Sequence, residues 1–228
     1  MEILSRLPVQ SLLRFKCVSK FWEALISDPY FKMKHLNQAR DFPKLLITKI
    51  SKDGLFSVHC CPLSSLPLVE DVQKLDCPFY PKPTSFNILC CCDGFFVIEV
   101  RDNFNLLLWN PSTRELVVLP AQEFPVGDRS CFGMGYDSTS GEYKILHMRQ
   151  DLRRSLPSEI LALKGGSWRR IDKNPRGFIN LLFAMQFLAF VHAAFHWIGL
   201  SRERYFVVVS FSISNEVYGE IPLPPEKC

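Results

Sequence analysis

The sequence predicts a small helical module at the N-terminus, followed by a larger all-β domain built from antiparallel hairpins. In the first forty residues, apolar side chains recur at three- and four-residue steps between Leu4 and Ile26, which is typical of short amphipathic helices. Beyond Pro43, short runs rich in aromatic and β-branched residues alternate with clusters of Gly, Pro, Asn, Asp and Ser, which is typical of hairpins. The change of pattern predicts a helical domain over residues 1–42 and a β-domain over residues 43–228.

The helix boundaries follow from residues that begin helices. Pro8 fits the first turn of a helix, where its missing N–H has no partner to lose. Ser19 is predicted to cap a helix that runs through residues 22–27, and Asp28 followed by Pro29 begins another that reaches Arg40. Helices this short are not stable alone, so we expect them to pack on each other and on a partner.

The β region shows both hairpins and a coarse repeat. Prolines that end strands fall at Pro67, Pro120, Pro175 and Pro224, spaced 53, 55 and 49 residues apart. A period near fifty with several strands per unit favours a propeller-like β-domain, and an irregular β-sandwich is the alternative. The predicted hairpins pair residues 104–110 with 115–119, 131–136 with 143–148, 158–163 with 168–171, and 205–213 with 217–221.

Charge is unevenly distributed along the chain. Residues 1–50 hold nine Lys and Arg against four Asp and Glu, a net charge of +5, whereas residues 51–228 hold eighteen against nineteen, a net charge of −1. A basic head on a near-neutral body suits an acidic protein partner and lacks the continuous basic stripe that nucleic acid requires. We therefore expect protein partners and no nucleic acid.

The nine cysteines do not have the spacing of a metal site, because they form no CxxC pair and no zinc-type pattern with histidine. Cys90, Cys91 and Cys92 are consecutive, and in a strand they would point to alternating faces. An odd number of cysteines with no preceding signal peptide predicts reduced thiols in a protein of the cytoplasm, the nucleus or both.

Residues 178–200 are mostly apolar over a length that would span a bilayer. Polar residues interrupt this stretch, and its flanks carry no charge asymmetry, so we expect buried strands and no membrane partner. The interrupting residues are Asn180, Gln186, His192 and His196.

Signatures of catalysis are weak. His192 and His196 have the spacing of a helical zinc pair, but no glutamate follows His192 and the context predicts strands. Gly133 and Gly135 form a lone Gly-x-Gly without a third glycine or a following helix, and no Gly-x-Ser-x-Gly occurs. We predict no catalytic residue, no metal ligand and no cofactor, and we do not expect an enzyme.

Two groups of motifs resemble one known family. Residues 2–22, from Glu-Ile-Leu-Ser-Arg-Leu-Pro to Val-Ser-Lys-Phe-Trp, with Leu-Ile-Ser-Asp-Pro-Tyr-Phe at 25–31, resemble the F-box of plant-type F-box proteins. Seven further segments resemble, in order and spacing, the kelch-like F-box-associated domain that follows the F-box in one large plant subfamily. They are Cys-Asp-Gly-Phe at 92–95, Leu-Trp-Asn-Pro-Ser-Thr-Arg at 108–114, Phe-Gly-Met-Gly-Tyr-Asp at 132–137, Glu-Tyr-Lys at 142–144, Ser-Trp-Arg at 167–169, Phe-His-Trp at 195–197 and Glu-Ile-Pro-Leu-Pro at 220–224.

The resemblance implies a non-catalytic substrate receptor of an SCF-type cullin–RING ubiquitin ligase. Its F-box would dock onto the Skp-type adaptor, which bridges to the cullin and RING subunits, while the β-domain would bind an unknown target protein for ubiquitination. Adaptor contact is assigned, by family position, to Leu4, Leu7, Pro8, Leu12, Val18 and Trp22. A core role is an equal alternative for Val18 and Trp22. The residues expected to hold the helices together are Leu13, Phe15, Leu25 and Ile26.

The chain departs from the family pattern at both ends. In the family, a Leu-Pro pair and an acidic, apolar turn precede the Glu-Ile-Leu found here at 2–4, and the associated domain continues beyond the position of Cys228. We therefore expect a truncated first helix and a C-terminally incomplete β-domain. The alternative function is a β-domain that binds proteins outside the ligase, or a non-productive F-box fragment.

Loops are expected to read the target, because loops carry most recognition on β-scaffolds. The candidates are residues 122–130, 150–155 and 201–204. The stretch from Arg149 to Arg154 would attract an acidic or phosphorylated segment, and a solvated loop is the alternative.

Overall fold

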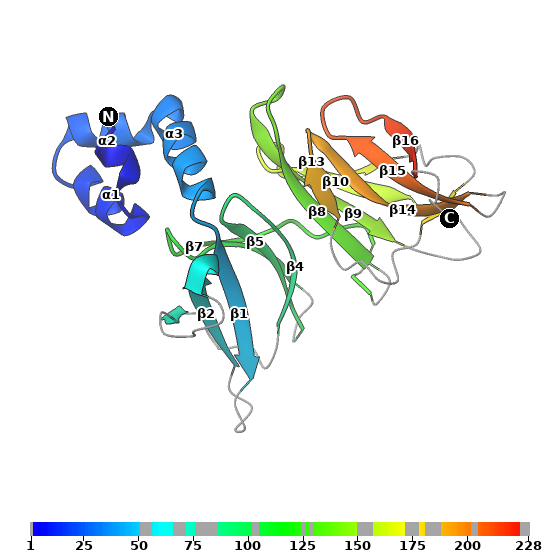
Figure 1. Cartoon of the computed structure of the whole chain (residues 1–228), viewed down its shortest axis with the longest axis horizontal. Helices are drawn as coiled ribbons and strands as arrows, with labels where there is room; N and C mark the ends of the chain where they lie inside the picture. The colour runs from blue at the N-terminus through cyan, green and yellow to red at the C-terminus, as the bar shows by residue number, and fades with distance from the viewer. Residues whose placement is uncertain are drawn as a thin grey trace. The chain divides into compact units, whose positions relative to one another are not determined.

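The computed structural model describes residues 2–50, 56–65, 72–75, 86–101, 105–124, 126–127, 130–149, 157–171, 178–180, 188–201 and 205–223. Short helices come first in the chain and antiparallel strands follow (Figure 1). Contacts divide the chain into two compact units, Met1–Ser85 with Trp109–Leu116, and Phe86–Leu108 with Val117–Cys228. The last helix ends at Arg40 and the first strand begins at Lys44. The domain boundary between residues 42 and 43 stays a prediction.

The helices begin where their capping residues predict. A 3-10 turn, η1 (Leu4–Arg6), precedes α1 (Val9–Lys16), α2 (Lys20–Ser27) and α3 (Pro29–Arg40). Ser19 Oγ accepts a hydrogen bond from the N–H of Trp22 at 3.3 Å, which caps α2. Asp28 Oδ1 accepts from the N–H groups of Tyr30 and Phe31 at 2.9 and 3.1 Å, and Pro29 occupies the first turn of α3. Both predicted caps are confirmed.

The core of the helices is small. Leu12 of α1, Ile26 of α2 and Phe31 of α3 are its buried apolar residues. Half-buried side chains pack around them, namely Leu4, Leu7 and Trp22. The role predicted for Ile26, holding the helices together, is confirmed.

The described strands form four sheets, in the orders β1-β2-β3, β4-β5-β6-β7, β11-β10-β9-β8 and β12-β14-β15-β16, with β13 also paired to β14. The sheets begin at Lys44, Phe86, Ser130 and Phe178, at intervals of 42, 44 and 48 residues. The strands are β1 (Lys44–Ile50), β2 (Phe56–Pro62), β3 (Gln73–Leu75), β4 (Phe86–Cys92), β5 (Phe95–Val100), β6 (Asn105–Asn110), β7 (Glu115–Val118), β8 (Ser130–Asp137), β9 (Glu142–Arg149), β10 (Ser158–Ala162), β11 (Trp168–Ile171), β12 (Phe178–Asn180), β13 (Ala189–Val191), β14 (Ala194–Ser201), β15 (Phe206–Ser212) and β16 (Tyr218–Pro222); a short 3-10 turn, η2 (Leu63–Ser65), follows β2.

The four predicted hairpins are confirmed. They correspond to β6–β7, β8–β9, β10–β11 and β15–β16, whose members are neighbours in their sheets. The turn between β8 and β9 is tighter than predicted, because Asp137 and Glu142 pair across it. Of the four prolines in the predicted repeat, Pro120 follows β7, while residues 67, 175 and 224 lie outside the described residues.

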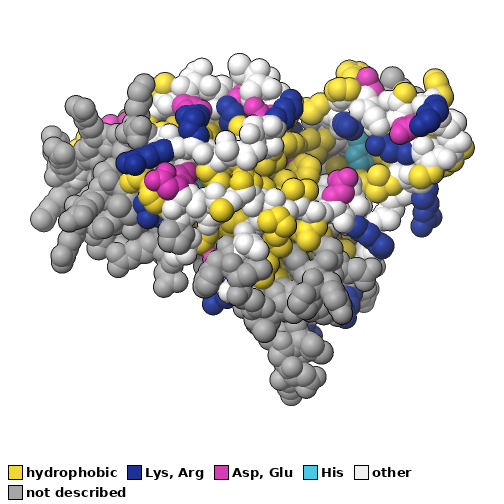
Figure 2. Space-filling model, turned by 180° about the vertical axis from the view of Figure 1, so that it is seen from behind, with side chains coloured by type: hydrophobic (Ala, Val, Ile, Leu, Met, Phe, Trp, Pro, Cys, Tyr) yellow, Lys and Arg dark blue, Asp and Glu magenta, His cyan; other side chains and the backbone are white. Residues whose placement is uncertain are grey.

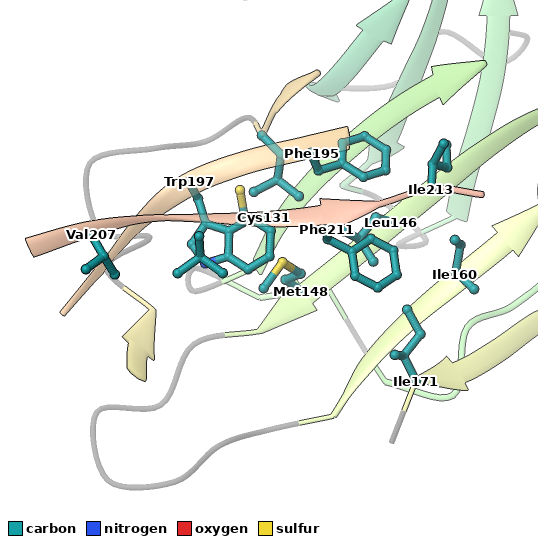
Figure 3. Close-up of a cluster of buried hydrophobic side chains, with 12 residues drawn as sticks. Cys131, Leu146, Met148, Ile160, Ile171, Phe195, Trp197, Val207, Phe211 and Ile213 are labelled. Carbon is teal, nitrogen blue, oxygen red and sulfur yellow. The ribbon is translucent and has the colours of Figure 1, made fainter. Parts of the chain in front are cut away.

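The sheet β8–β11 has an apolar core on each of its faces. One face packs with the sheet of β14–β16 (Figure 3), through Cys131, Leu146, Met148, Ile160, Ile171, Leu188, Phe195, Trp197, Val207, Val209, Phe211 and Ile213. The other face packs with the sheet of β4–β6, through Cys90, Val97, Leu106, Leu108, Leu119, Phe132, Met134, Ile145 and Leu161. Side chains alternate between the two faces along each strand. Antiparallel sheets stacked in chain order are the propeller-like architecture that the repeat predicts, placed after an N-terminal helical module.

Two glycines permit this close stacking. A Cβ on Gly133 of β8 would lie 2.7 Å from the ring of Phe195, and a Cβ on Gly135 would overlap the ring of Phe190. The Gly-x-Gly of the sequence therefore lies in a strand and makes room for aromatic rings.

The apolar stretch at residues 178–200 forms strands wherever it is described. It contains β12, β13 and most of β14, and burial alternates residue by residue along β14. Residues 181–187 lie outside the described part. Within the described residues, no helix has the length and apolar character needed to span a bilayer.

Candidate functional site

The six residues assigned to adaptor contact do not share one environment. Leu12 is 5% exposed and lies in the core of the helices, where a partner does not reach it. Leu4, Leu7 and Trp22 are half-buried around that core. Pro8 and Val18 are exposed, Val18 at 67%. Adaptor contact by these residues stays a prediction, and the geometry favours Val18 among them.

An apolar surface lies where α1 meets α2. Val18 occupies the turn between the helices, and Phe21 is 72% exposed on the first turn of α2. The ring of Trp22 stacks on Phe15 at a centroid distance of 5.5 Å and meets Phe21 edge-on at 6.5 Å. We call Phe15, Val18, Phe21 and Trp22 the α1–α2 apolar surface. Ordered aromatic rings that remain exposed are typical of a protein-docking surface.

Two of these residues were not predicted as contacts. Phe15 was expected to hold the helices together, but it is 36% exposed and covers Trp22 from outside the core. Phe21 was not singled out. The sequence does contain a signal for the exposure of Phe21. Trp22 and Ile26 lie four residues apart on the side of α2 that faces the core, and Phe21 lies off that side.

Basic residues are close in sequence to the residues of the α1–α2 apolar surface. Arg14 and Lys16 lie in the last turn of α1, and Lys20 begins α2. Lys20 Nζ lies 3.0 Å from Glu23 Oε2, and this hydrogen bond and ion pair lower the pKa of Glu23. Figure 2 shows one face of the molecule, on which hydrophobic, basic and acidic side chains are interspersed. An apolar surface with basic residues close in sequence fits a partner that is apolar with an acidic rim.

In the second unit, Asp137 connects two hairpins. Its buried carboxylate lies 2.8 Å from Lys144 Nζ and accepts hydrogen bonds from Ser214 Oγ at 2.6 Å, Ser140 Oγ at 2.8 Å and Thr139 N–H at 2.9 Å. Burial alone would raise the pKa of Asp137, but these interactions outweigh burial and hold that pKa well below its usual range. The contact joins the turn of β8–β9 to the turn of β15–β16.

Hydrogen bonds between turns show which turns of the second unit lie at the same end. Tyr143 O–H donates to Asp93 Oδ2 at 3.1 Å, which brings the β4–β5 turn beside the β8–β9 turn. With the Asp137–Ser214 contact, three turns therefore share one end, which we call the turn end. The loop end is the opposite one, where β8 begins at Ser130 and β9 finishes at Arg149. Eight residues of strand separate the ends by about 25 Å.

The three loops predicted to read a target lie largely outside the described residues. Residues 122–124, 126–127, 130 and 201 are described, whereas residues 125, 128–129, 150–155 and 202–204 lie outside the described part. Of the predicted basic stretch, Arg149 is described and residues 150–154 are not. Target binding by these loops stays a prediction.

The histidines do not form a helical pair. His192 lies in the turn between β13 and β14 with a φ of 49°, while His196 lies within β14. In the described residues, no group of three or more His, Cys, Asp or Glu side chains is placed to hold a metal ion.

The consecutive cysteines alternate in exposure as predicted. Cys90 is buried, Cys91 exposed and Cys92 half-buried. Burial raises the pKa of Cys90 well above its ordinary value, and that of Cys131 to about 12. Such thiols are weak nucleophiles. Cys77 and Cys228 lie outside the described residues.

Comparison with known proteins identifies both parts of the chain. The F-box domain model matches residues 1–34, and the model of the F-box associated beta propeller domain matches residues 47–228. Three similar proteins of Arabidopsis thaliana are F-box/kelch-repeat protein At3g23880, putative F-box protein At1g47790 and F-box/kelch-repeat protein At3g17530, which are 26%, 30% and 28% identical. The matches cover 98%, 99% and 98% of this chain and 64%, 58% and 59% of those proteins. The chain therefore spans about three fifths of the length of these relatives, and it belongs to the plant F-box proteins that carry an F-box-associated β-propeller domain.

Proposed function

We propose that this protein is the substrate receptor of an SCF-type cullin–RING ubiquitin ligase. The F-box docks onto the Skp-type adaptor through the α1–α2 apolar surface, and the adaptor connects it to the cullin and RING subunits. The β-propeller-type domain binds a target protein and presents it for ubiquitination. The complex works in the cytoplasm, the nucleus or both.

The observation that carries this proposal is the exposed apolar surface of a family-typical F-box. Val18 and Phe21 are 67% and 72% exposed on helices whose own core has only three buried apolar residues. Short helices of this kind need further burial to be stable, and a partner groove supplies it.

A receptor role requires no chemistry from the chain itself. F-box proteins with associated domains are generally adaptors rather than catalysts, and transfer of ubiquitin is the work of the recruited conjugating enzyme. The feature of the described residues that supports binding is the α1–α2 apolar surface.

The test is reconstitution of the whole complex. The chain is co-expressed with a Skp-type adaptor, a cullin and a RING subunit, and co-elution is measured by gel filtration. We expect stoichiometric co-elution for the natural chain and its loss for Val18→Asp. The matched control is Tyr30→Asp on α3, which is also exposed, at 68%, and lies off the α1–α2 apolar surface. Absence of the natural chain from the complex would contradict the proposal.

A further inference from the structure

The sheet of β12–β16 is packed on one of its faces within the described part of the chain. Its inner face is buried against the sheet β8–β11 through Phe195, Trp197, Val207, Val209 and Phe211. The side chains that alternate with these form the opposite face, which we call the outer face of β13–β16. They are half-buried or exposed, whereas the sheet β8–β11 has a buried apolar core on both of its faces.

Bulky apolar side chains occupy the half of the outer face nearer the loop end. The strand register pairs Val208 with Ile198 on one side and with Ile221 on the other. In the adjacent row, Leu200 pairs with Phe206. Phe206 and Ile221 are 55% and 47% exposed. A solvated face of an antiparallel sheet usually carries polar side chains, so two apolar rows on this face indicate an interaction surface.

Smaller side chains occupy the half of the outer face nearer the turn end. These small residues are Ala189, Ala194, Ser210, Ser212 and Gly219. Val191 and His196 are the two larger side chains in this half, and they pair with Ala194 and Ala189. The outer face is therefore raised toward the loop end and shallow toward the turn end.

The outer face carries no Lys, Arg, Asp or Glu among the described residues of β13–β16. The charged residue of these four strands is Glu220, which pairs with Val209 and so belongs to the inner face. An uncharged face packs against a copy of itself without like-charge repulsion, whereas a strongly charged partner would find no complementary group on it.

We propose that the outer face of β13–β16 binds the same face of a second copy of this chain. A two-fold axis that lies in the interface and runs across the strands reverses their direction in the partner. The bulky half of each copy then lies over the shallow half of the other, which gives the interface a complementary shape. Such an interface is isologous and has the form of the sheet-on-sheet packing on the inner face. The inference goes beyond the receptor role and does not depend on it.

The size of the outer face sets the strength of the dimer. With strands about 4.8 Å apart and a rise of about 3.4 Å per residue, four strands and the 7 residues of β15 give about 450 Å² of flat area on each copy. Two copies contribute about 900 Å², and interfaces below about 1,200 Å² are typical of weak, transient complexes. We therefore expect a dimer with a dissociation constant in the micromolar range.

The test is sedimentation velocity of the full chain at concentrations from about 1 to about 200 μM, because mass action makes a weak dimer depend on concentration. We expect the natural chain to pass from monomer to dimer over this range. Ile221→Lys should weaken association by about tenfold or more, because the new charge would lie unpaired in an apolar interface. Val118→Lys on β7, at a position 64% exposed and outside the outer face, is the matched control and should associate as the natural chain does.

A mixing experiment tests the identity of the partner and its orientation. Phe206 and Ser212 are the first and last residues of β15, so the two-fold arrangement brings Phe206 of one copy near Ser212 of the other. Phe206→Lys and Ser212→Glu should each stay monomeric alone, whereas their equimolar mixture should form a dimer because the new charges pair. Circular dichroism and urea midpoints show whether each variant is folded. If either fails to fold, Ile221→Lys against Val118→Lys still decides the question.

Three results would overturn the inference. They are a natural chain that stays monomeric at every concentration, which would leave the outer face to a different protein, equal association of Ile221→Lys and Val118→Lys, and a mixture of two folded variants that forms no dimer. Because association is measured without the adaptor, each of these results leaves the receptor role standing.

Discussion

The helices of the first unit and the stacked sheets of the second differ in how much apolar surface they bury. The helices enclose three buried apolar side chains, Leu12, Ile26 and Phe31, and leave Val18 and Phe21 exposed. The sheet β8–β11 of the second unit contributes to two cores, which hold twelve and nine buried residues of the described part of the chain. The comparison shows that apolar side chains serve stability in the sheets, whereas in the helices many of them remain available to a partner.

The largest effect should follow from truncation of a core ring in the sheets. Phe195→Ala removes a fully buried side chain that lies against Gly133 and Phe190. We expect the free energy of unfolding to fall by about 3–5 kcal/mol, because the lost burial is added to the cost of a cavity. Urea denaturation followed by tryptophan fluorescence measures it. Phe206→Ala in the same sheet, 55% exposed, is the matched control and should lose less than about 1 kcal/mol. Similar losses for both variants would refute the assignment of these residues to core and surface.

A smaller effect should separate core from surface within the helices. Leu12→Ala should lower the stability of α1–α3 by about 3 kcal/mol, whereas Phe21→Ala should change it by less than about 0.5 kcal/mol, because that ring is mostly exposed. Hydrogen exchange of the backbone amides in these helices reports the local stability directly. If Phe21→Ala destabilised the helices as much as Leu12→Ala, the α1–α2 apolar surface would be part of their core.

The smallest of the three effects concerns Asp137. Replacement by Asn removes the charge that pairs with Lys144 and weakens the hydrogen bonds to it, and we expect a loss of about 2 kcal/mol at pH 7. The low folded-state pKa gives the sign of the pH dependence. An aspartate with an unfolded pKa of about 3.9 contributes its stability above that pH, and the contribution is lost as the pH falls toward the lower folded value.

Urea midpoints measured between pH 7 and pH 3 test this expectation. The natural chain should lose stability below about pH 4, and Asp137→Asn should lack that part of the fall. Asp41→Asn at the exposed end of α3 is the control and should keep it. Parallel pH profiles for the natural chain and Asp137→Asn would show that this carboxylate has no such role.

Much of the fold was predictable because its signals are local. Ser19 and Asp28 cap helices through donors two or three residues away, and the hairpins pair residues within about twenty positions of each other. The Asp137–Ser214 contact joins residues 77 positions apart, and no local pattern predicts which hydroxyl reaches a distant carboxylate.

The candidate site was predictable only in part. Family position selected Leu12, but its burial depends on how three helices pack together. Phe21 carries the most exposed ring of the surface, and its exposure follows from the stripe that Trp22 and Ile26 define on α2. The contact of the Arg149 guanidinium with the Phe124 ring joins the last residue of β9 to the segment between β7 and β8, so it depends on tertiary packing that no local pattern predicts.

The central claim is that the α1–α2 apolar surface is the docking site for the Skp-type adaptor. Isothermal titration calorimetry of the adaptor into the full chain tests it most directly, with the natural chain, the double variant Val18→Ser with Phe21→Ser, and Tyr30→Ser as the matched control. We predict that the double variant binds at least about a hundredfold more weakly, while Tyr30→Ser binds as the natural chain does and all three chains unfold at the same urea concentration. Unchanged affinity of the double variant would contradict the claim.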